Sequence, residues 1–213
     1  MIQPTIHLHI ATDEWLASAA NPLALPQWAQ LPYRRLVHTV TGAPVAQATT
    51  IRLVASPTTL WVRFDCADAD AWATLTGHDD PIYTEEVVEL FIASGSDRPH
   101  RYYELEVNPL NTRFDGIIHN PDEQRPTMTL DTRWDPPWQS WTAVDPAGWQ
   151  CCMAIPWHSL GVSDGRGSWR CNFYRIDRPR DGTPSSESAW SPTRRVPADF
   201  HIPSQFGTLV IHE

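Results

Sequence analysis

Apolar and polar residues alternate with a period of two in several parts of the chain, as they do in β-strands that bury one face. The clearest examples are residues 60–65, 103–108 and 172–177. Twenty prolines and ten glycines interrupt the apolar runs. This pattern predicts an all-β fold, an antiparallel β-sandwich with jelly-roll or immunoglobulin-like layers. Further strands are expected at residues 5–10, 35–40, 49–55, 86–93, 113–118, 127–131, 141–145, 149–155 and 206–212.

Helical spacing is limited to short stretches, such as the turn predicted over residues 156–161, which ends at a glycine. No linker or repeat divides the sequence, so we expect residues 1–213 to form one domain. Three long connections remain, at residues 66–85, 119–126 and 177–204. Long loops in a compact domain are often functional, and we therefore expect a site there.

Charge and hydropathy exclude several classes of function. The net charge is −9, all sixteen basic residues are arginine, and they form no cluster, so the chain is not expected to bind nucleic acid. No apolar run approaches the roughly 18 residues of a membrane-spanning helix. The N-terminus has no basic segment followed by an apolar run, which predicts a cytoplasmic protein rather than a secreted one.

Catalytic motifs of the common hydrolases and nucleotide-binding enzymes are absent from the sequence. Glu104 and Glu106 would share one strand face about 7 Å apart, which fits a polar sheet face better than a glycosidase pair. We therefore expect a protein that is not an enzyme.

Glu89 differs from the other carboxylates because it shares its predicted strand face with apolar residues. A carboxylate there needs a hydrogen-bond donor or an arginine, or it loses its charge. Two interpretations stay open. Glu89 either forms a buried ion pair, with Arg63 or Arg175 as partner, or accepts hydrogen bonds from the hydroxyl groups of a ligand.

Seven segments, in this order along the chain, resemble the family 9 carbohydrate-binding modules and their stand-alone relatives. Together they span roughly residues 28–212. The segments are residues 60–65, 80–92, 102–109, 154–157, 172–175, 189–193 and 200–207.

The resemblance implies a non-catalytic β-sandwich that binds a mono- or disaccharide, or the end of a glycan chain, between two aromatic rings. The slot aromatics of the family match Tyr83 and Phe200, and the acceptor carboxylate matches Glu89. Polar contacts match Glu106, Asn108 and Tyr174.

The sequence departs from the family pattern at several of these positions. The characterised modules carry Trp at both slot positions, and an expected Arg is replaced by Glu106. Trp72 and Trp190 are candidates for a substitute platform, although a core role is the alternative for Trp190. The family also resembles calcium-binding modules, and the candidate ligands for Ca²⁺ are Asp68, Asp70, Asp79 and Asp80.

Two other classes of function remain open. The same sandwich superfamily includes haem-b electron-transfer domains, which would require Met128 or Met153 with a histidine as axial ligands. A protein-interaction module is the other alternative, and it would show an extended apolar patch in place of an aromatic slot.

Overall fold

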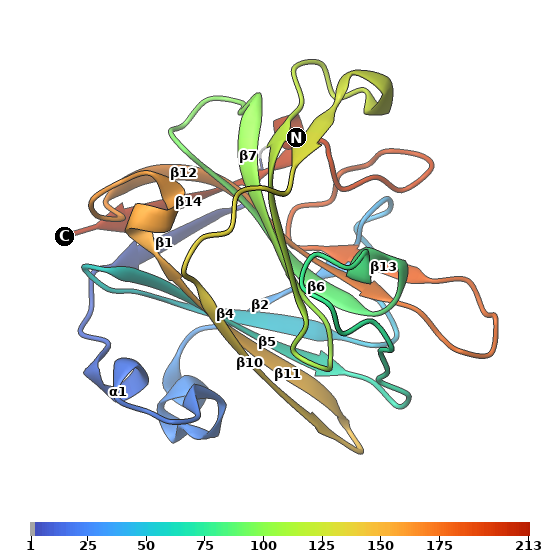
Figure 1. Ribbon diagram of the computed structural model, residues 1–213, viewed down its shortest axis with the longest axis horizontal. Coiled ribbons are helices and arrows are strands. Elements are labelled where there is room, and N and C mark those ends of the chain that lie inside the picture. Colours follow the sequence, from blue (N-terminus) through green and yellow to red (C-terminus); the bar gives the residue numbers. More distant parts are fainter. Residues whose placement is uncertain (1–2) are drawn as a thin grey trace.

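The structure, a computed structural model, describes residues 3–213, and two β-sheets packed face to face dominate it (Figure 1). The main path of the nine-stranded sheet runs β1 (Thr5–His9), β14 (Gly207–His212), β12 (Gly167–Asp177), β6 (Val87–Ser94), β7 (Arg101–Val107), β8 (Arg113–His119) and β9 (Thr129–Asp131). On its edge, β13 (Ser186–Ala189) pairs with β12 and with β3 (Val37–His38). The five-stranded sheet has the order β10 (Gln139–Asp145), β11 (Gly148–Pro156), β5 (Thr59–Ala67), β4 (Thr49–Ala55) and β2 (Arg34–Arg35).

The predicted β-sandwich is confirmed, with small differences in detail. All strand pairs are antiparallel except β1 with β14, which is parallel. The strand predicted at residues 35–40 is divided into the short strands β2 and β3, and β13, which was not predicted, lies inside the long connection expected at residues 177–204.

Helical structure is confined to short segments. They are α1 (Glu14–Ala17) and the 3₁₀ turns η1 (Pro22–Ala24), η2 (Pro26–Gln30), η3 (Ile82–Thr84), η4 (Arg125–Thr127), η5 (Trp157–Leu160) and η6 (Pro203–Gln205). The turn predicted at residues 156–161 is η5, and Gly161 follows it in the left-handed conformation, with φ 78°. Within residues 3–213, none of these helices has the length and apolar character needed to span a bilayer.

The main core lies between the two sheets, where the alternating apolar residues of both meet. Leu60, Val62 and Phe64 of β5 belong to it, as do Leu90 of β6 and Leu105 of β7. On β5, Trp61 points the other way, into a second cluster in which residues 16–31 cover the outer face of the five-stranded sheet.

The outer face of the nine-stranded sheet carries a third cluster, which includes Phe91, Tyr102, Tyr174 and Phe206. The turns η3, η4 and η6 and their adjoining loops cover this face. The side chains of β6 and β7 that point away from the main core therefore end beneath loops rather than in solvent.

Candidate functional site

A row of four paired residues crosses the outer face of the nine-stranded sheet. Tyr174 on β12 pairs with Glu89 on β6, Glu89 with Glu106 on β7, and Glu106 with Phe114 on β8. Directly opposed residues of an antiparallel pair have Cβ atoms about 5 Å apart. Glu104 lies on the same face of β7, since side chains two residues apart share a face. The strand register thus brings three carboxyl groups together.

Loops close a cavity of about 310 Å³ over these carboxyl groups. This volume is at the lower end of the range for small-molecule sites, about 300–1,000 Å³. Tyr83 on η3 and Phe200, the two residues that match the slot aromatics of the family, both line it. The other lining residues are Glu89, Glu104, Glu106, Phe114, Ile118, Arg125, Met128, Leu130, Ile176 and His201.

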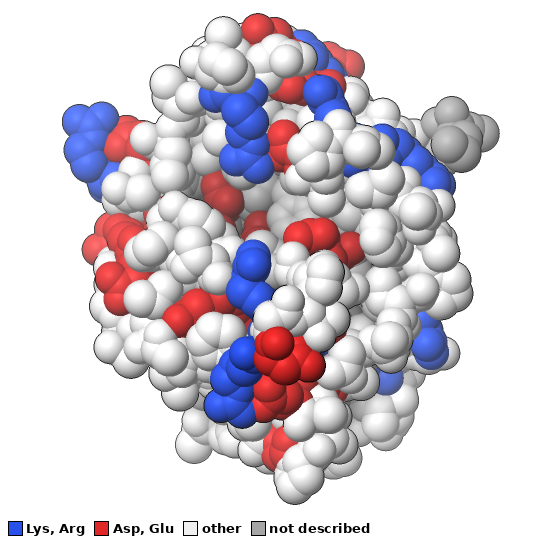
Figure 2. All heavy atoms as spheres, turned by 90° about the vertical axis from the view of Figure 1, so that its right-hand side faces the viewer, with Lys and Arg blue, Asp and Glu red and all other residues white. Residues whose placement is uncertain are grey.

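The face of the molecule on the η3 and β13 side is hollowed near its centre (Figure 2). Acidic atoms are set back inside this hollow, and basic atoms lie along its rim. The view agrees with a concave site whose acidic groups lie deep and whose opening is flanked by arginine.

Phe200 and Tyr83, the two aromatic residues expected to form a slot, are held in different ways. Phe200 is 8% exposed and stacks on Tyr174, with ring centroids 4.2 Å apart and an interplanar angle of 13°. The Tyr174 hydroxyl also donates a hydrogen bond to the Phe200 carbonyl at 2.9 Å. Tyr83 is 43% exposed, and its ring packs perpendicular to that of Phe114, with the ring centroids 5.7 Å apart. Phe200 is therefore a fixed wall, whereas Tyr83 is the more accessible ring.

The three carboxyl groups are buried, and their ligand oxygens all lie within 4.8 Å of one another. Burial raises the pKa of Glu89 and that of Glu106 well above the usual range, and repulsion among the carboxylates adds to the effect. Burial raises the pKa of Glu104 to about 7, while a hydrogen bond with Glu106 and the charge of Arg125 act in the opposite direction. Without a ligand, the cluster therefore holds protons at neutral pH.

His201 contributes no positive charge to the cavity. Burial, with a smaller contribution from Arg125, lowers its pKa to about 3, so the imidazole is neutral. Its Nδ1 lies 2.8 Å from the Tyr102 hydroxyl, and its Nε2 lies 3.9 Å from Glu104 Oε1. Arg125 stands at the opening, where its guanidinium pairs with Asp199 at 2.6 Å.

The ion pair considered for Glu89 is absent from the described residues. Arg63 belongs to the other sheet and pairs with Asp65 at 2.7 Å. Arg175 points to the opposite face of β12 and pairs with Asp68 at 2.6 Å. Neither arginine therefore meets Glu89. Glu104 and Glu106 share one face of β7 as expected for a polar sheet face, but the loops bury both residues.

Four of the residues expected in the site do not line the cavity. Tyr174 lies behind Phe200 and orients it. The Asn108 amide donates to the Leu75 carbonyl at 2.9 Å and accepts from two backbone N–H groups, so it holds the turn after β7. Trp72 donates to the Arg178 carbonyl, and Trp190 packs edge-on against Phe173 in the main core.

The four aspartates considered for calcium do not converge on one site. Asp68 lies next to Glu86 and Asp177, but the Arg175 guanidinium sits among these three carboxylates, 2.6, 3.9 and 3.8 Å away, where a cation would sit. Two of the other aspartates have separate partners. Asp70 pairs with Arg180, and Asp80 accepts a hydrogen bond from the Gly77 N–H.

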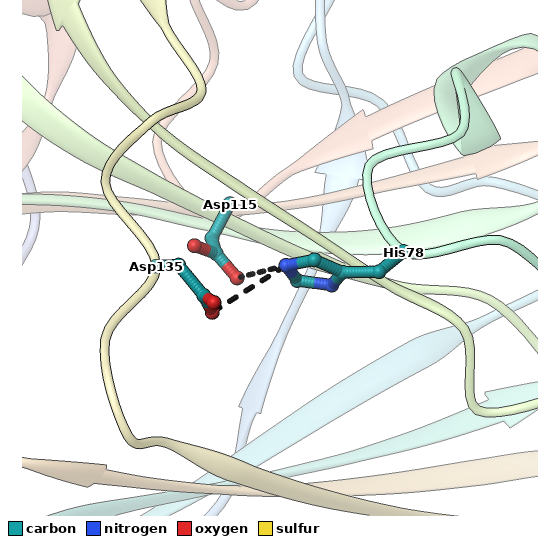
Figure 3. A group of neighbouring side chains, drawn as sticks. All are labelled: His78, Asp115 and Asp135. Carbon is teal, nitrogen blue, oxygen red and sulfur yellow. Dashed lines mark ion pairs between the residues drawn. The ribbon is translucent and has the colours of Figure 1, made fainter.

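Asp79 lies at a different cluster, formed by His78, Asp115 and Asp135 (Figure 3). The Nε2 atom of His78 lies 3.5 Å from Asp135, 3.6 Å from Asp79 and 3.8 Å from Asp115. The Trp138 indole donates to Asp115 at 2.9 Å, and burial raises the Asp115 pKa to about 6. These residues can interact as ion pairs with a protonated histidine, and none of them lines the aromatic cavity.

Both methionines considered as haem ligands are placed by the structure. Met153 is fully buried in the main core, and Met128 lies in the wall of the cavity above the three glutamates. The residues of the site that the sequence did not identify are Glu104, Arg125 and His201 as polar groups, with Phe114, Ile118, Met128, Leu130 and Ile176 as apolar ones.

Comparisons with known proteins agree with this architecture. A crystal structure of a Bacteroides uniformis protein, described provisionally as carbohydrate-binding, has a TM-score of 0.76 at 19% identity and covers 99% of this chain and 100% of its own. A family 9 carbohydrate-binding module from Caldicellulosiruptor kristjanssonii, solved with cellotriose, has a TM-score of 0.70 at 14% identity. The match covers 98% of this chain and 94% of that module. These likenesses establish the fold.

One curated relative is similar along nearly its whole length. It is named "Extracellular protein", comes from Arthroderma benhamiae, is 28% identical over 221 residues, and is matched over 95% of this chain and 96% of its own. The name of this relative contradicts the cytoplasmic location expected from the N-terminal sequence, and that expectation is withdrawn.

The sequence model of Carbohydrate-binding family 9 matches residues 37–211. The match includes every strand of the site, from β6 to β12, and both slot aromatics. This chain therefore belongs to carbohydrate-binding family 9.

Proposed function

We propose that the chain is a non-catalytic module that binds a monosaccharide unit or a glycan chain end in the cavity between Tyr83 and Phe200. The observation that carries this proposal is the shared cavity itself, in which two aromatic side chains from separate loops face a floor of carboxyl groups. A pyranose presents C–H groups on its faces and hydroxyl groups around its edge. Aromatic rings suit the faces, and carboxyl groups suit the hydroxyls.

The arrangement of the carboxyl groups favours binding over hydrolysis. A glycosidase needs two carboxyl groups that flank the scissile bond. Here Glu89, Glu104 and Glu106 come from two adjacent strands of one sheet and lie on the same side of the cavity. No two of them can flank a glycosidic bond from opposite sides, so we infer that the bound sugar is not cleaved.

The solved complexes support the same class of ligand. The Caldicellulosiruptor kristjanssonii module was crystallised with cellotriose and also with glucose. Isothermal titration of this chain with both sugars tests the proposal, together with a reducing-end assay. We expect binding heats and no release of reducing sugar.

Glu89→Gln provides the matched test of the floor. The amide keeps the shape of the side chain but cannot give up a proton to become a carboxylate that accepts from sugar hydroxyls, so we expect weaker sugar binding by about 1–3 kcal/mol. The Glu14→Gln variant removes an exposed carboxylate on α1 and serves as the control. Unchanged affinity in Glu89→Gln, in a variant that is folded by circular dichroism, would show that Glu89 does not contact the sugar.

A further inference from the structure

The carboxyl cluster of the cavity has no positively charged partner, and its three buried acids can ionise together only if a cation joins them. Within residues 3–213, no arginine lies within ion-pair distance of Glu89, Glu104 or Glu106. Arg125 is engaged with Asp199, and neutral His201 lies 3.9 Å from Glu104. Buried acids without a partner are costly, because the charged form loses its hydration.

Glu106 is the member of the cluster with the least access to water and to hydrogen-bond donors. Its side chain is completely buried and lines the cavity, and apart from the proton shared with Glu104, neither Oε1 nor Oε2 has a hydrogen-bond donor in the described part of the chain. The neighbouring acids can supply only a shared proton. A buried acceptor of this kind aimed into a cavity indicates that the missing donor arrives with the ligand.

The geometry of the cluster matches an ammonium group. Ammonium carries three donors and no acceptor, and its N–H bonds are tetrahedral. Oxygens bonded to one such nitrogen at about 2.9 Å lie about 4.7 Å from one another. Each of the three acids offers one carboxyl oxygen that lies within 4.8 Å of the other two, so the cluster is compact enough for one ammonium nitrogen to contact all three.

The walls of the cavity favour the same ligand over a metal ion. Ca²⁺ takes six to eight oxygen ligands. Apart from the three carboxyl groups, the lining is largely aromatic and aliphatic and includes Tyr83, Phe114 and Phe200. Aromatic faces attract an ammonium group and also cover the C–H face of a pyranose.

We propose that the cavity selects sugars with a free primary amine, whose ammonium group sits on Glu89, Glu104 and Glu106 while the pyranose ring lies between Tyr83 and Phe200. This inference rests on the proposed carbohydrate binding and names the class of sugar. Acetylation of the amine removes both the charge and two donors, so N-acetylated sugars are excluded from the same position.

Proton release accompanies this mode of binding. The ammonium charge stabilises the carboxylates, so a cluster that holds protons without ligand gives them up when the amine enters. The charged and titratable groups that face the cluster are Arg125 on η4, His201 and Asp199 on the loop before η6, Tyr102 on β7 and Tyr174 on β12. His201, Tyr102 and Tyr174 are uncharged near neutral pH, because burial lowers the pKa of the histidine and raises the pKa of both tyrosines.

Isothermal titration with glucosamine, glucose and N-acetylglucosamine at pH 6.5 tests the inference. We expect glucosamine to bind at least about tenfold more tightly than either of the other sugars, the scale of hydrogen bonds to charged groups. Repeating the titration in buffers of different ionisation enthalpy should reveal proton release with glucosamine only. Glu106→Gln should reduce the preference for glucosamine to less than about threefold, and the Glu14→Gln control should retain it.

The outcomes separate the two proposals. Equal affinity of the unmodified chain for glucosamine and glucose would overturn amine selection and leave sugar binding intact. An absence of heat with all three sugars would overturn both. Titration with Ca²⁺ alone is the third arm: saturable binding that disappears in Glu106→Gln would assign the cluster to a metal and overturn the ammonium site. The comparison of sugars uses the unmodified chain, so it holds even if Glu106→Gln does not fold.

Discussion

Removal of the accessible slot ring should weaken sugar binding without unfolding the protein. Tyr83 is 43% exposed and lines the cavity, and its perpendicular contact with Phe114 covers at most one face of the ring. One face is roughly a third of the 150–250 Å² that a buried tyrosine covers, or about 60 Å². At about 25 cal/mol per Å², the loss is about 1.5 kcal/mol, which corresponds to about a tenfold increase in Kd.

Titration calorimetry of Tyr83→Ala with the best-binding sugar measures this loss. Tyr33→Ala is the matched control, because Tyr33 is 50% exposed and lies beside Arg52 of the five-stranded sheet, outside the cavity. Both variants should keep their stability to within about 1 kcal/mol, as expected for exposed side chains. An unchanged Kd in Tyr83→Ala, or an equal loss in Tyr33→Ala, would refute the assignment of Tyr83 to the slot.

Three further predictions concern the supports of the site. Phe200→Ala should lower the free energy of unfolding by about 3 kcal/mol as well as abolishing sugar binding, because the ring is stacked on Tyr174; chemical denaturation measures the first effect, and a loss below about 1 kcal/mol would contradict it. Arg175→Met should destabilise the chain by about 3–5 kcal/mol, because it leaves buried Asp68 without its counter-charge; a neutral result in urea would show that the pair is dispensable. The unfolding temperature of the ligand-free chain should fall between pH 6.5 and 9, because the raised pKa values of Glu104, about 7, and Glu86, about 9, mean that the native state holds protons that the unfolded state has lost; a rise over this window would contradict the sign.

The alternation along the chain predicted the strands and their faces well. Glu89 was placed on the face that carries Phe91, and this is the face of the cavity. The period of two fixes which side chains share a face, so such predictions need no knowledge of the partner strand. The four-residue strand β13 was missed because it reads Ser-Glu-Ser-Ala, which carries no apolar alternation.

The depth of the site was not predictable from local pattern. Glu104 and Glu106 look like solvent-facing residues of a half-buried strand, and only the covering loops bury them. Arg125 and His201 lie in loops 76 positions apart in the sequence, and no sequence periodicity predicts that both line the same cavity. The roles of Asn108, which binds the Leu75 carbonyl, and of Trp190, which packs against the Phe173 ring, likewise depend on contacts with remote segments.

A crystal structure of the chain with a bound sugar would locate the binding site. We expect a pyranose between Tyr83 and Phe200, with its polar groups directed at the three glutamates. A second cavity, of about 410 Å³, lies beside Trp61 and Trp141 on the outer face of the other sheet. Sugar density there, with the cavity above Glu106 empty, would show that the sugar-binding site is not the glutamate cavity.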